Sequence, residues 1–149
     1  MRFLGNIEAK IDAKGRAFLP ATFRKVLQAS GQETLVLRRD VFQRCLVLYP
    51  ESVWNERMDM LKQKLNQWNA QHQQMLRQFV AEAEVVSLDG NGRFLISRRL
   101  QKASDIEQAI RFIGMDDTIE IWSEETISQA LKTEEDFGAE LEKIMNIEF

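Results

Sequence analysis

One five-residue phrase occurs twice in the chain, as Asp12-Ala13-Lys14-Gly15-Arg16 and as Asp89-Gly90-Asn91-Gly92-Arg93. Each copy lies between two short apolar stretches, which predicts a strand, a turn and a second strand. Glycine at the fourth position supplies the positive φ that a short hairpin loop with a bulge needs. Aspartate ends the incoming strand and arginine begins the outgoing one, so a carboxylate faces a guanidinium across the turn. We expect each phrase to be the tip of a β-hairpin.

The repetition distinguishes this phrase from an ordinary turn. Asp, Gly and Asn are common turn residues, and a single copy would most often be purely structural. At one constant offset, the surrounding residues also match, including Phe18 with Leu95 and Lys25 with Lys102. Turn chemistry accounts for the repeated Asp and Gly but not for the repeated Arg. The pattern therefore indicates two copies of one arginine-bearing unit.

The elements that follow each phrase repeat in the same order. Helical spacing after Pro20 and two later apolar runs predict a helix over 20–28 and strands over 34–37 and 45–49. In the second copy the corresponding elements are expected at 97–103, 109–113 and 118–122. A unit of this size is marginal alone, so we expect the two copies to pack together about a pseudo-twofold axis.

Two further segments complete the expected organisation. Apolar residues at helical spacing over 54–79 predict an amphipathic helical segment or hairpin, broken in two near 66–69. It is expected to cover the core or else to contact another subunit. From Ser123 the chain is expected to be helical and acidic, as a solvated tail or, second, a partner-binding segment. The expected parts are a first repeat (1–54), a connecting helical segment (55–81), a second repeat (82–131) and an acidic tail (132–149).

The charge is unevenly spread along the chain. The net charge is −3, but residues 1–80 carry 13 Lys and Arg against 7 Asp and Glu, whereas residues 81–149 carry 7 against 16. One face can therefore meet a polyanion while another faces water or a second subunit. The sequence shows no long apolar run and no secretory leader, and we expect a cytoplasmic protein. Cys45 lies in an apolar run and is expected to be a reduced core residue.

Enzymatic and metal-binding signals are weak. No nucleophile elbow, zinc-protease helix or phosphate-binding loop is present, and one His and one Cys in different elements do not suggest a dyad. His72 lacks neighbouring ligands at metal spacing. The sequence after Asp89 resembles the start of a calcium loop but lacks its glycine and its final glutamate. We expect no enzyme activity, no cofactor, no metal and no small-molecule ligand.

DNA fits the repeated arginines better. A guanidinium at a hairpin tip can contact phosphate or pair with guanine O6 and N7 in the major groove, which admits a two-stranded ribbon. We therefore expect double-stranded DNA to be bound by Asp12, Lys14, Gly15, Arg16, Asp89, Asn91, Gly92 and Arg93. Candidates for phosphate contacts are Lys10, Arg24, Lys25, Arg98, Arg99 and Lys102. Asn91 stands where the first turn has Lys14, so the second turn is less basic.

The twin turns, together with Leu46-Val47-Leu48-Tyr49-Pro50 ahead of a tryptophan-bearing helix, resemble the MraZ family of bacterial transcription regulators. The resemblance implies an α+β fold in which two tandem AbrB-like repeats form a pseudo-twofold, double-ψ-like swapped-hairpin barrel with covering helices. It also implies a ring-shaped homo-oligomer, associated with the nucleoid, that binds repeated promoter boxes of the division and cell-wall gene cluster, usually as a repressor. Asp12 and Arg16 match the first family motif, and Asp89 and Arg93 match the second.

Other functions stay open at this point. An antitoxin-type protein would use an AbrB-like unit for DNA and a disordered tail for a toxin, but the duplication and the short tail disfavour it. A structural or protein-binding oligomer that ignores nucleic acid is supported by the acidic pI of about 5.3. An enzyme is the remote alternative.

Overall fold

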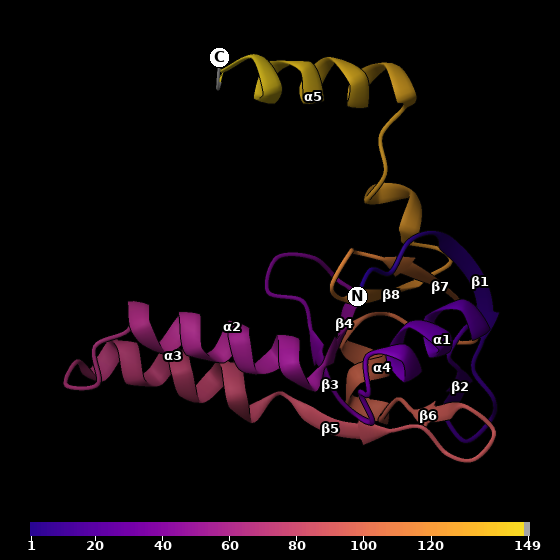
Figure 1. Ribbon diagram of the computed structural model, residues 1–149, viewed down its shortest axis with the longest axis horizontal. Helices are drawn as coiled ribbons and strands as arrows, with labels where there is room; N and C mark the ends of the chain where they lie inside the picture. The colour runs from indigo at the N-terminus through magenta and orange to yellow at the C-terminus, as the bar shows by residue number, and fades with distance from the viewer. Residues whose placement is uncertain (148–149) are drawn as a thin grey trace.

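The computed structural model describes residues 1–147, which form a mixed α+β fold with the same element order in both halves (Figure 1). The first half contains β1 (Asn6–Lys10), β2 (Arg16–Phe18), α1 (Ala21–Ala29), β3 (Thr34–Arg39) and β4 (Leu46–Pro50). The second half contains β5 (Glu84–Ser87), β6 (Arg93–Leu95), α4 (Arg98–Ala103), β7 (Ala109–Gly114) and β8 (Ile119–Ser123). Between them lie α2 (Glu51–Lys64) and α3 (Ala70–Ala81), and after them η1 (Ile127–Gln129) and α5 (Glu134–Ile147). The predicted duplication of elements is confirmed.

Local chemistry explains where several helices begin. Pro20 directly precedes α1, as expected of a residue that fixes φ and lacks an N–H. Ser97 precedes α4 and its hydroxyl accepts a hydrogen bond from the Leu100 N–H. Asn69 caps α3 by accepting from the His72 N–H at 3.1 Å. The predicted break between α2 and α3 is therefore present.

The two repeats pair their strands with each other. In the larger sheet, with strand order β1-β7-β8-β4-β3-β5, β1 pairs with β7 and β5 pairs with β3, while β4 and β8 join the repeats at the centre. Strands β2 and β6 form a separate antiparallel ribbon. These pairings follow one approximate twofold symmetry, in which β1 to β4 exchange with β5 to β8. The exchange turns the β1–β7 pair into the β5–β3 pair and leaves the β4–β8 and β2–β6 pairs unchanged.

This pairing modifies two expectations from the sequence. Strands β1 and β2 pair only next to the turn, through an Ile11–Ala17 bridge, because each strand then continues against the other repeat. The expected closed barrel is wrong: within residues 1–147, β1 and β5 are the edge strands of an open sheet. The hairpin prediction holds for the turns. Beyond the turns, β1, β2, β5 and β6 each pair with a strand of the other repeat, and the six-stranded sheet stays open.

The core is shared by the two repeats. Its largest fully buried side chains include Phe3 and Phe23 from the first half and Phe94 and Phe112 from the second. Phe3 meets Phe23 edge to face at 5.6 Å between ring centroids, and Phe94 meets Phe112 at 6.3 Å. Because neither half has a core of its own, the copies are expected to fold as one unit.

A smaller apolar cluster lies beside the main core. It contains Cys45, Trp122 and Ile127, with Ile113 packed against it. Cys45 is buried, as predicted, and burial raises the pKa of its thiol. The thiol is therefore protonated and unreactive at neutral pH.

Helices α2 and α3 form an arm that projects from the body (Figure 1). At its base Trp54 stacks on Phe79, with ring centroids 5.3 Å apart, and meets Tyr49 edge to face. The buried Arg38 guanidinium lies 4.3 Å from the centre of the Phe79 ring and donates to the Phe79 carbonyl at 2.9 Å. The expected covering layer is thus limited to this base, since no residue of α3 is buried.

The C-terminal segment differs from the expected helix at Ser123. That residue still belongs to β8, where the Glu124 N–H donates to the Ala109 carbonyl, so the helix cannot begin there. A 3-10 turn follows, and Ile127 packs in the small cluster. Helix α5 then lies away from the body (Figure 1), with residues 131–146 exposed. None of the helices in residues 1–147 has the length and hydrophobicity needed to span a membrane.

Candidate nucleic-acid interface

Each of the two turns holds its arginine through its aspartate. In the first turn, Oδ1 of Asp12 accepts from the backbone N–H groups of Lys14 and Arg16, both at 2.9 Å. The other oxygen, Oδ2, accepts from Arg16 Nε at 2.9 Å. The Asp12 N–H donates to the Arg16 carbonyl, and the Gly15 N–H donates to the Asp12 carbonyl. The predicted carboxylate–guanidinium pair is present.

The second turn repeats these contacts atom for atom. Asp89 Oδ1 accepts from the N–H groups of Asn91 and Arg93, and Oδ2 accepts from Arg93 Nε, all at 2.9 Å. Gly15 has φ of 86° and Gly92 has φ of 82°, as the turn geometry requires. The two arginines are therefore presented by equivalent local structures.

The aspartates bond to the Nε atoms of the two arginines and leave their Nη groups available. Only Nε bonds to the aspartate, and neither Nη group of Arg16 or Arg93 has a hydrogen-bond partner within residues 1–147. The side chains of Arg16 and Arg93 are 33% and 23% exposed. A guanidinium fixed at Nε with free Nη groups can donate two parallel bonds to one planar acceptor.

The electrostatics of the turns favour ionised aspartates. The Arg16 backbone N–H is the largest cause that lowers the pKa of the Asp12 carboxyl, and burial opposes it. The Arg16 guanidinium and the Lys14 N–H lower this pKa further. For Asp89 the Arg93 backbone N–H is the largest cause of a pKa that is likewise lowered. Both carboxylates are therefore charged wherever the protein is folded near neutral pH.

The β2–β6 ribbon places the two arginines on one face. Its register pairs Arg16 with Leu95, Ala17 with Phe94 and Phe18 with Arg93. Ala17 and Phe94 are buried, so the alternating residues Arg16, Phe18, Arg93 and Leu95 share the outer face. Arg16 and Arg93 are diagonal neighbours, which are typically roughly 7–8 Å apart in such a ribbon. The Arg93 guanidinium also lies 5.7 Å from the centre of the Phe18 ring.

Each turn is tied to the other repeat. The Ile96 N–H donates to the Gly15 carbonyl at 2.8 Å, and the Leu19 N–H donates to the Gly92 carbonyl at 3.0 Å. A Cβ added at Gly15 would lie 2.9 Å from the Ile96 carbonyl oxygen. The turns therefore cannot move independently, and both arginines belong to one rigid surface.

Two side chains at equivalent positions support this arrangement. Gln101 in α4 donates to the Ile96 carbonyl at 2.8 Å and passes over Gly15, where a Cβ would lie 2.7 Å from Gln101 Nε2. Arg24 in α1 donates to the Leu19 carbonyl at 3.0 Å and passes over Gly92, where a Cβ would lie 2.6 Å from Arg24 Nη1. Each helix thus holds the turn of the opposite repeat.

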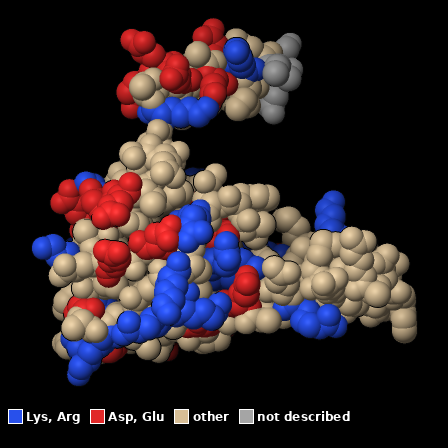
Figure 2. Space-filling view, turned by 180° about the vertical axis from the view of Figure 1, so that it is seen from behind, with Lys and Arg blue, Asp and Glu red and all other residues tan. Residues whose placement is uncertain are grey.

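The candidate phosphate contacts fall into two groups. Lys10, Lys14, Lys25, Arg98 and Lys102 are exposed and make no ion pair in the part of the chain that the structure describes. Arg24 is half-buried against Gly92, and Arg99 is paired with Glu84 at 2.6 Å. Figure 2 shows basic side chains gathered over the end of the body that carries the turns, whereas acidic side chains gather on α5 at the opposite end.

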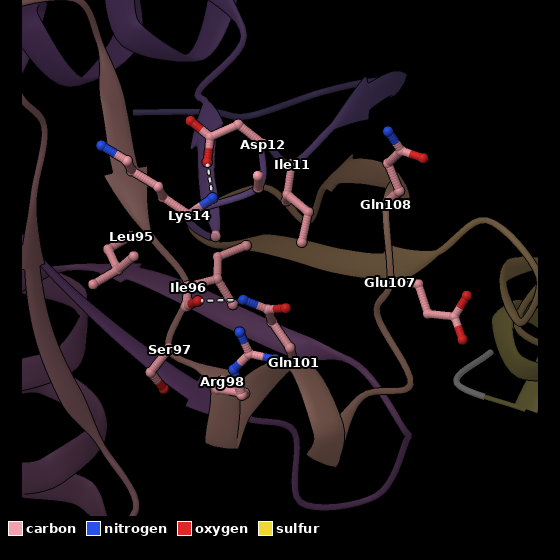
Figure 3. Close-up of a pocket in the computed structure, with 12 residues that line it drawn as sticks. Ile11, Asp12, Lys14, Leu95, Ile96, Ser97, Arg98, Gln101, Glu107 and Gln108 are labelled. Atoms are coloured by element: carbon pink, nitrogen blue, oxygen red, sulfur yellow. Dashed lines mark hydrogen bonds between the residues drawn. The ribbon is translucent and has the colours of Figure 1, made fainter.

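A hollow of about 580 Å³ lies between the first turn and the start of α4 (Figure 3). Lys14, Arg98 and Gln101 line one part of it, while Glu107 and Gln108 line another. Both signs of charge are present, so the hollow extends the polar surface beside the turn. Within residues 1–147 no group of three His, Cys, Asp or Glu side chains is placed to hold a metal ion.

Comparison with known proteins identifies the family. The family model described as "MraZ protein, putative antitoxin-like" matches residues 2–78 and again 79–146, once for each repeat. The chain belongs to the MraZ family. A protein of Phocaeicola vulgatus named "Transcriptional regulator MraZ" is 64% identical over 97% of this chain and 94% of its own length. Proteins of the same name are 57% identical in Bacteroides thetaiotaomicron (99% of this chain, 95% of their own) and 35% identical in Christiangramia forsetii (97% and 94%).

The surface of this MraZ chain includes two side chains that the sequence did not predict. Phe18 beneath the Arg93 guanidinium and Gln101 above Gly15 were not expected as parts of the site. The constant offset that aligns Arg16 with Arg93 also aligns Phe18 with Leu95 and Arg24 with Gln101. That alignment was a usable signal for both positions, because equivalent residues of a pseudo-twofold fold occupy equivalent places.

Proposed function

We propose that the chain is a DNA-binding transcriptional regulator that contacts double-stranded DNA with the β2–β6 ribbon and its two turns. One observation carries the proposal: two arginines, each held at Nε by an aspartate, lie on the same face of one ribbon with their Nη groups free. The shared name of the relatives, "Transcriptional regulator MraZ", supports the regulatory role.

The geometry suits base recognition by Arg16 and Arg93. A two-stranded ribbon enters the major groove, where guanine O6 and N7 accept two parallel bonds from one guanidinium. Ordering a free arginine side chain costs up to about 2 kcal/mol, and the aspartates have already ordered these two. Within the proposed interface Asp12 and Asp89 position the two arginines, while Gly15 and Gly92 allow the turns to form.

The surrounding cations complete the proposed surface. Lys14 on the first turn, with Lys10, Lys25, Arg98 and Lys102, contacts phosphates and supplies affinity that falls with salt. Arg24 and Arg99 contribute long-range positive charge while they remain bonded within the chain. The second turn has the uncharged Asn91 where the first turn has Lys14, so it should bind phosphate more weakly.

The finer function follows from the resemblance described above. We propose that the protein represses the promoter of the division and cell-wall gene cluster by binding repeated boxes there. It does so as a ring-shaped homo-oligomer. It lies in the cytoplasm and is associated with the nucleoid. The strand pairs formed between the two repeats support this proposal, since the resemblance implies an intramolecular swapped-hairpin arrangement. A ring would present many such ribbons to spaced repeats, so that avidity compensates for the acidic net charge of each chain.

A double substitution tests the proposal. The Arg16→Ala, Arg93→Ala variant should keep its circular dichroism spectrum and oligomeric mass, because neither side chain is in the core. Its affinity for the DNA upstream of its own gene, measured by fluorescence anisotropy at moderate salt, should fall at least roughly 30-fold, since each bidentate pair is worth about 1–3 kcal/mol.

The matched control is Arg77→Ala. Arg77 is exposed on α3 of the arm, so its loss removes one positive charge at a distance from the ribbon. We expect less than a fewfold loss of affinity for this control. Full affinity in the double variant would refute the proposed role of the ribbon.

A further inference from the structure

Helix α5 carries an apolar stripe. Phe137, Leu141, Ile144 and Met145 are spaced three and four residues apart and therefore lie on one face of the helix. All four are exposed, although they are large and apolar. Glu135 and Glu142 flank the stripe on one side and Asp136 and Glu140 on the other, while Lys143 lies on the opposite face. Glu140 also pairs with Lys132 of its own chain, so the other three carboxylates are the ones available to a partner. The four apolar side chains of the stripe are thus exposed on an acidic, amphipathic helix.

A matching apolar groove lies at the base of the arm. It is formed where the loop between β3 and β4 meets α2, and its volume is about 370 Å³. Phe42, Met60 and Leu61 line it together with Tyr49 and Phe79. Phe42 is 89% exposed and Val41 beside it is also exposed, which is unusual for such residues in a folded protein. The groove is therefore an exposed apolar surface.

The charges around the groove complement the stripe. Arg57 and Lys64 line the groove, and Lys64 makes no ion pair within the described residues. Arg57 contacts Asp117 at 3.1 Å, through only one of its Nη groups. Asp40 also lines the groove, but its carboxylate accepts from the backbone N–H groups of Phe42 and Gln43 and is held by its own loop. An acidic helix fits this rim better than a basic or neutral one.

We infer that the α5 stripe of one copy docks in the arm-base groove of a second copy of this chain. Within one chain α5 points away from the body (Figure 1), and none of residues 134–146 is buried. Acidic residues on both sides of the stripe disfavour docking on an anionic membrane. Leu141 and Ile144 enter the groove beside Phe42 and Met60, and the flanking carboxylates meet Arg57 and Lys64.

This contact has a consequence for symmetry. The stripe and the groove are different surfaces, so the contact is head to tail and each chain both gives and receives a helix. Such contacts close into a ring or continue as a filament. The inference thus deepens the self-association within the proposed function and rests on it, but it does not depend on DNA binding.

A cysteine cross-link tests the docking without DNA. The chain carrying Leu141→Cys and Met60→Cys should, on mild oxidation, give covalent dimers and longer multimers on a non-reducing gel. The matched control carries Lys143→Cys and Met60→Cys and should stay monomeric, because position 143 lies about 200° around the helix from position 141. Cys45 does not compete, since it is buried with a raised pKa.

A charge substitution supplies an independent measurement. Leu141→Glu should raise the dissociation constant for self-association, measured by sedimentation at several concentrations, by at least roughly tenfold, because it places a charge in an apolar groove. Lys143→Glu introduces the same side chain on the opposite face and should leave the constant unchanged. Both residues are exposed, so neither variant should affect folding of the body.

The outcomes separate this inference from the proposed function. A cross-link confined to the monomer would show that α5 folds back on its own chain and would overturn the inference. Equal cross-linking in the control pair, or an unchanged mass for Leu141→Glu, would also overturn it while leaving DNA binding and self-association by another surface intact. A wild-type protein that is monomeric at every concentration would remove both the docking and the proposed ring.

Discussion

Gly15 offers a direct test of how the first turn packs against the second repeat. The residue has φ of 86°, and a Cβ placed there would lie 2.9 Å from the Ile96 carbonyl oxygen and 2.7 Å from Gln101 Nε2. The same carbonyl accepts the Gln101 hydrogen bond. Gly15→Ala therefore strains the backbone of the first turn and also pushes apart a contact made by the second repeat.

The magnitude follows from these two effects. A non-glycine residue in the left-handed region costs about 1–2 kcal/mol, and loss of the Gln101 hydrogen bond costs about 0.5–1.5 kcal/mol more. We expect Gly15→Ala to lower the free energy of unfolding by about 1.5–3.5 kcal/mol. Gly92→Ala should lower it less, because the atoms nearest its Cβ belong to the flexible end of Arg24 rather than to backbone.

The assay is urea unfolding followed by circular dichroism at one fixed protein concentration. Gly90→Ala is the matched control, since it lies in the second turn without a positive φ and a Cβ there would meet nothing within 4 Å. We expect this control to change the free energy of unfolding by no more than about 0.5 kcal/mol. Equal stability of Gly15→Ala and Gly90→Ala would refute the proposed tight contact between the first turn and the second repeat.

Two further predictions concern the charged groups of the turns. The pKa values of Asp12 and Asp89 are lowered in the folded protein, so the stability from their ionised forms is present above the ordinary value of 3.8 and is lost as pH falls through the lower folded value. NMR titration of the two carboxyl carbons should give midpoints below 3.8, and a midpoint at or above it would contradict the observed hydrogen bonds. Arg24→Gln should keep the stability, because Gln101 makes the equivalent bond in the other repeat, and should lower the salt dependence of DNA binding by less than one phosphate contact, because Arg24 supplies only long-range charge. A salt slope reduced by a full phosphate contact would show that Arg24 contacts phosphate directly.

Much of the local structure could be predicted from the sequence because it depends on neighbouring residues. The Asp, Gly and Arg of each turn interact within five residues, and the offset between copies reveals their equivalence. Pro20, Ser97 and Asn69 mark helix starts by local hydrogen bonding and backbone restriction. These features need no knowledge of the tertiary fold.

Strand partners could not be predicted in the same way. Alternation shows that Ala17 faces the core and Arg16 faces outward, but it carries no information on which strand lies alongside. The pairing of β2 with β6 brings Phe18 to Arg93, and this contact depends on the exchange between repeats. The expected barrel failed for the same reason, since closure depends on pairing between distant strands.

The arm was only partly predicted because periodicity shows an apolar stripe without showing what covers it. Trp54 and Phe79 belong to the predicted stripe and do pack at the base of the arm. Trp68 belongs to the same stripe and is 87% exposed near the far end of the arm. A stripe at helical spacing thus identified the helices but not their distance from the core.

The central claim is that Arg16 and Arg93 read bases as guanidiniums held by aspartates. The most direct measurement is the ratio of affinities for the upstream promoter DNA and for an unrelated duplex, compared between the wild type and the Arg16→Lys, Arg93→Lys variant. Lysine keeps the positive charge but cannot donate the planar pair of bonds. We expect binding to the unrelated duplex to persist. The free-energy difference between binding to the promoter and binding to the unrelated duplex should shrink by about 1–3 kcal/mol for each arginine, so that the ratio of affinities falls. An unchanged ratio would contradict base reading by these two residues.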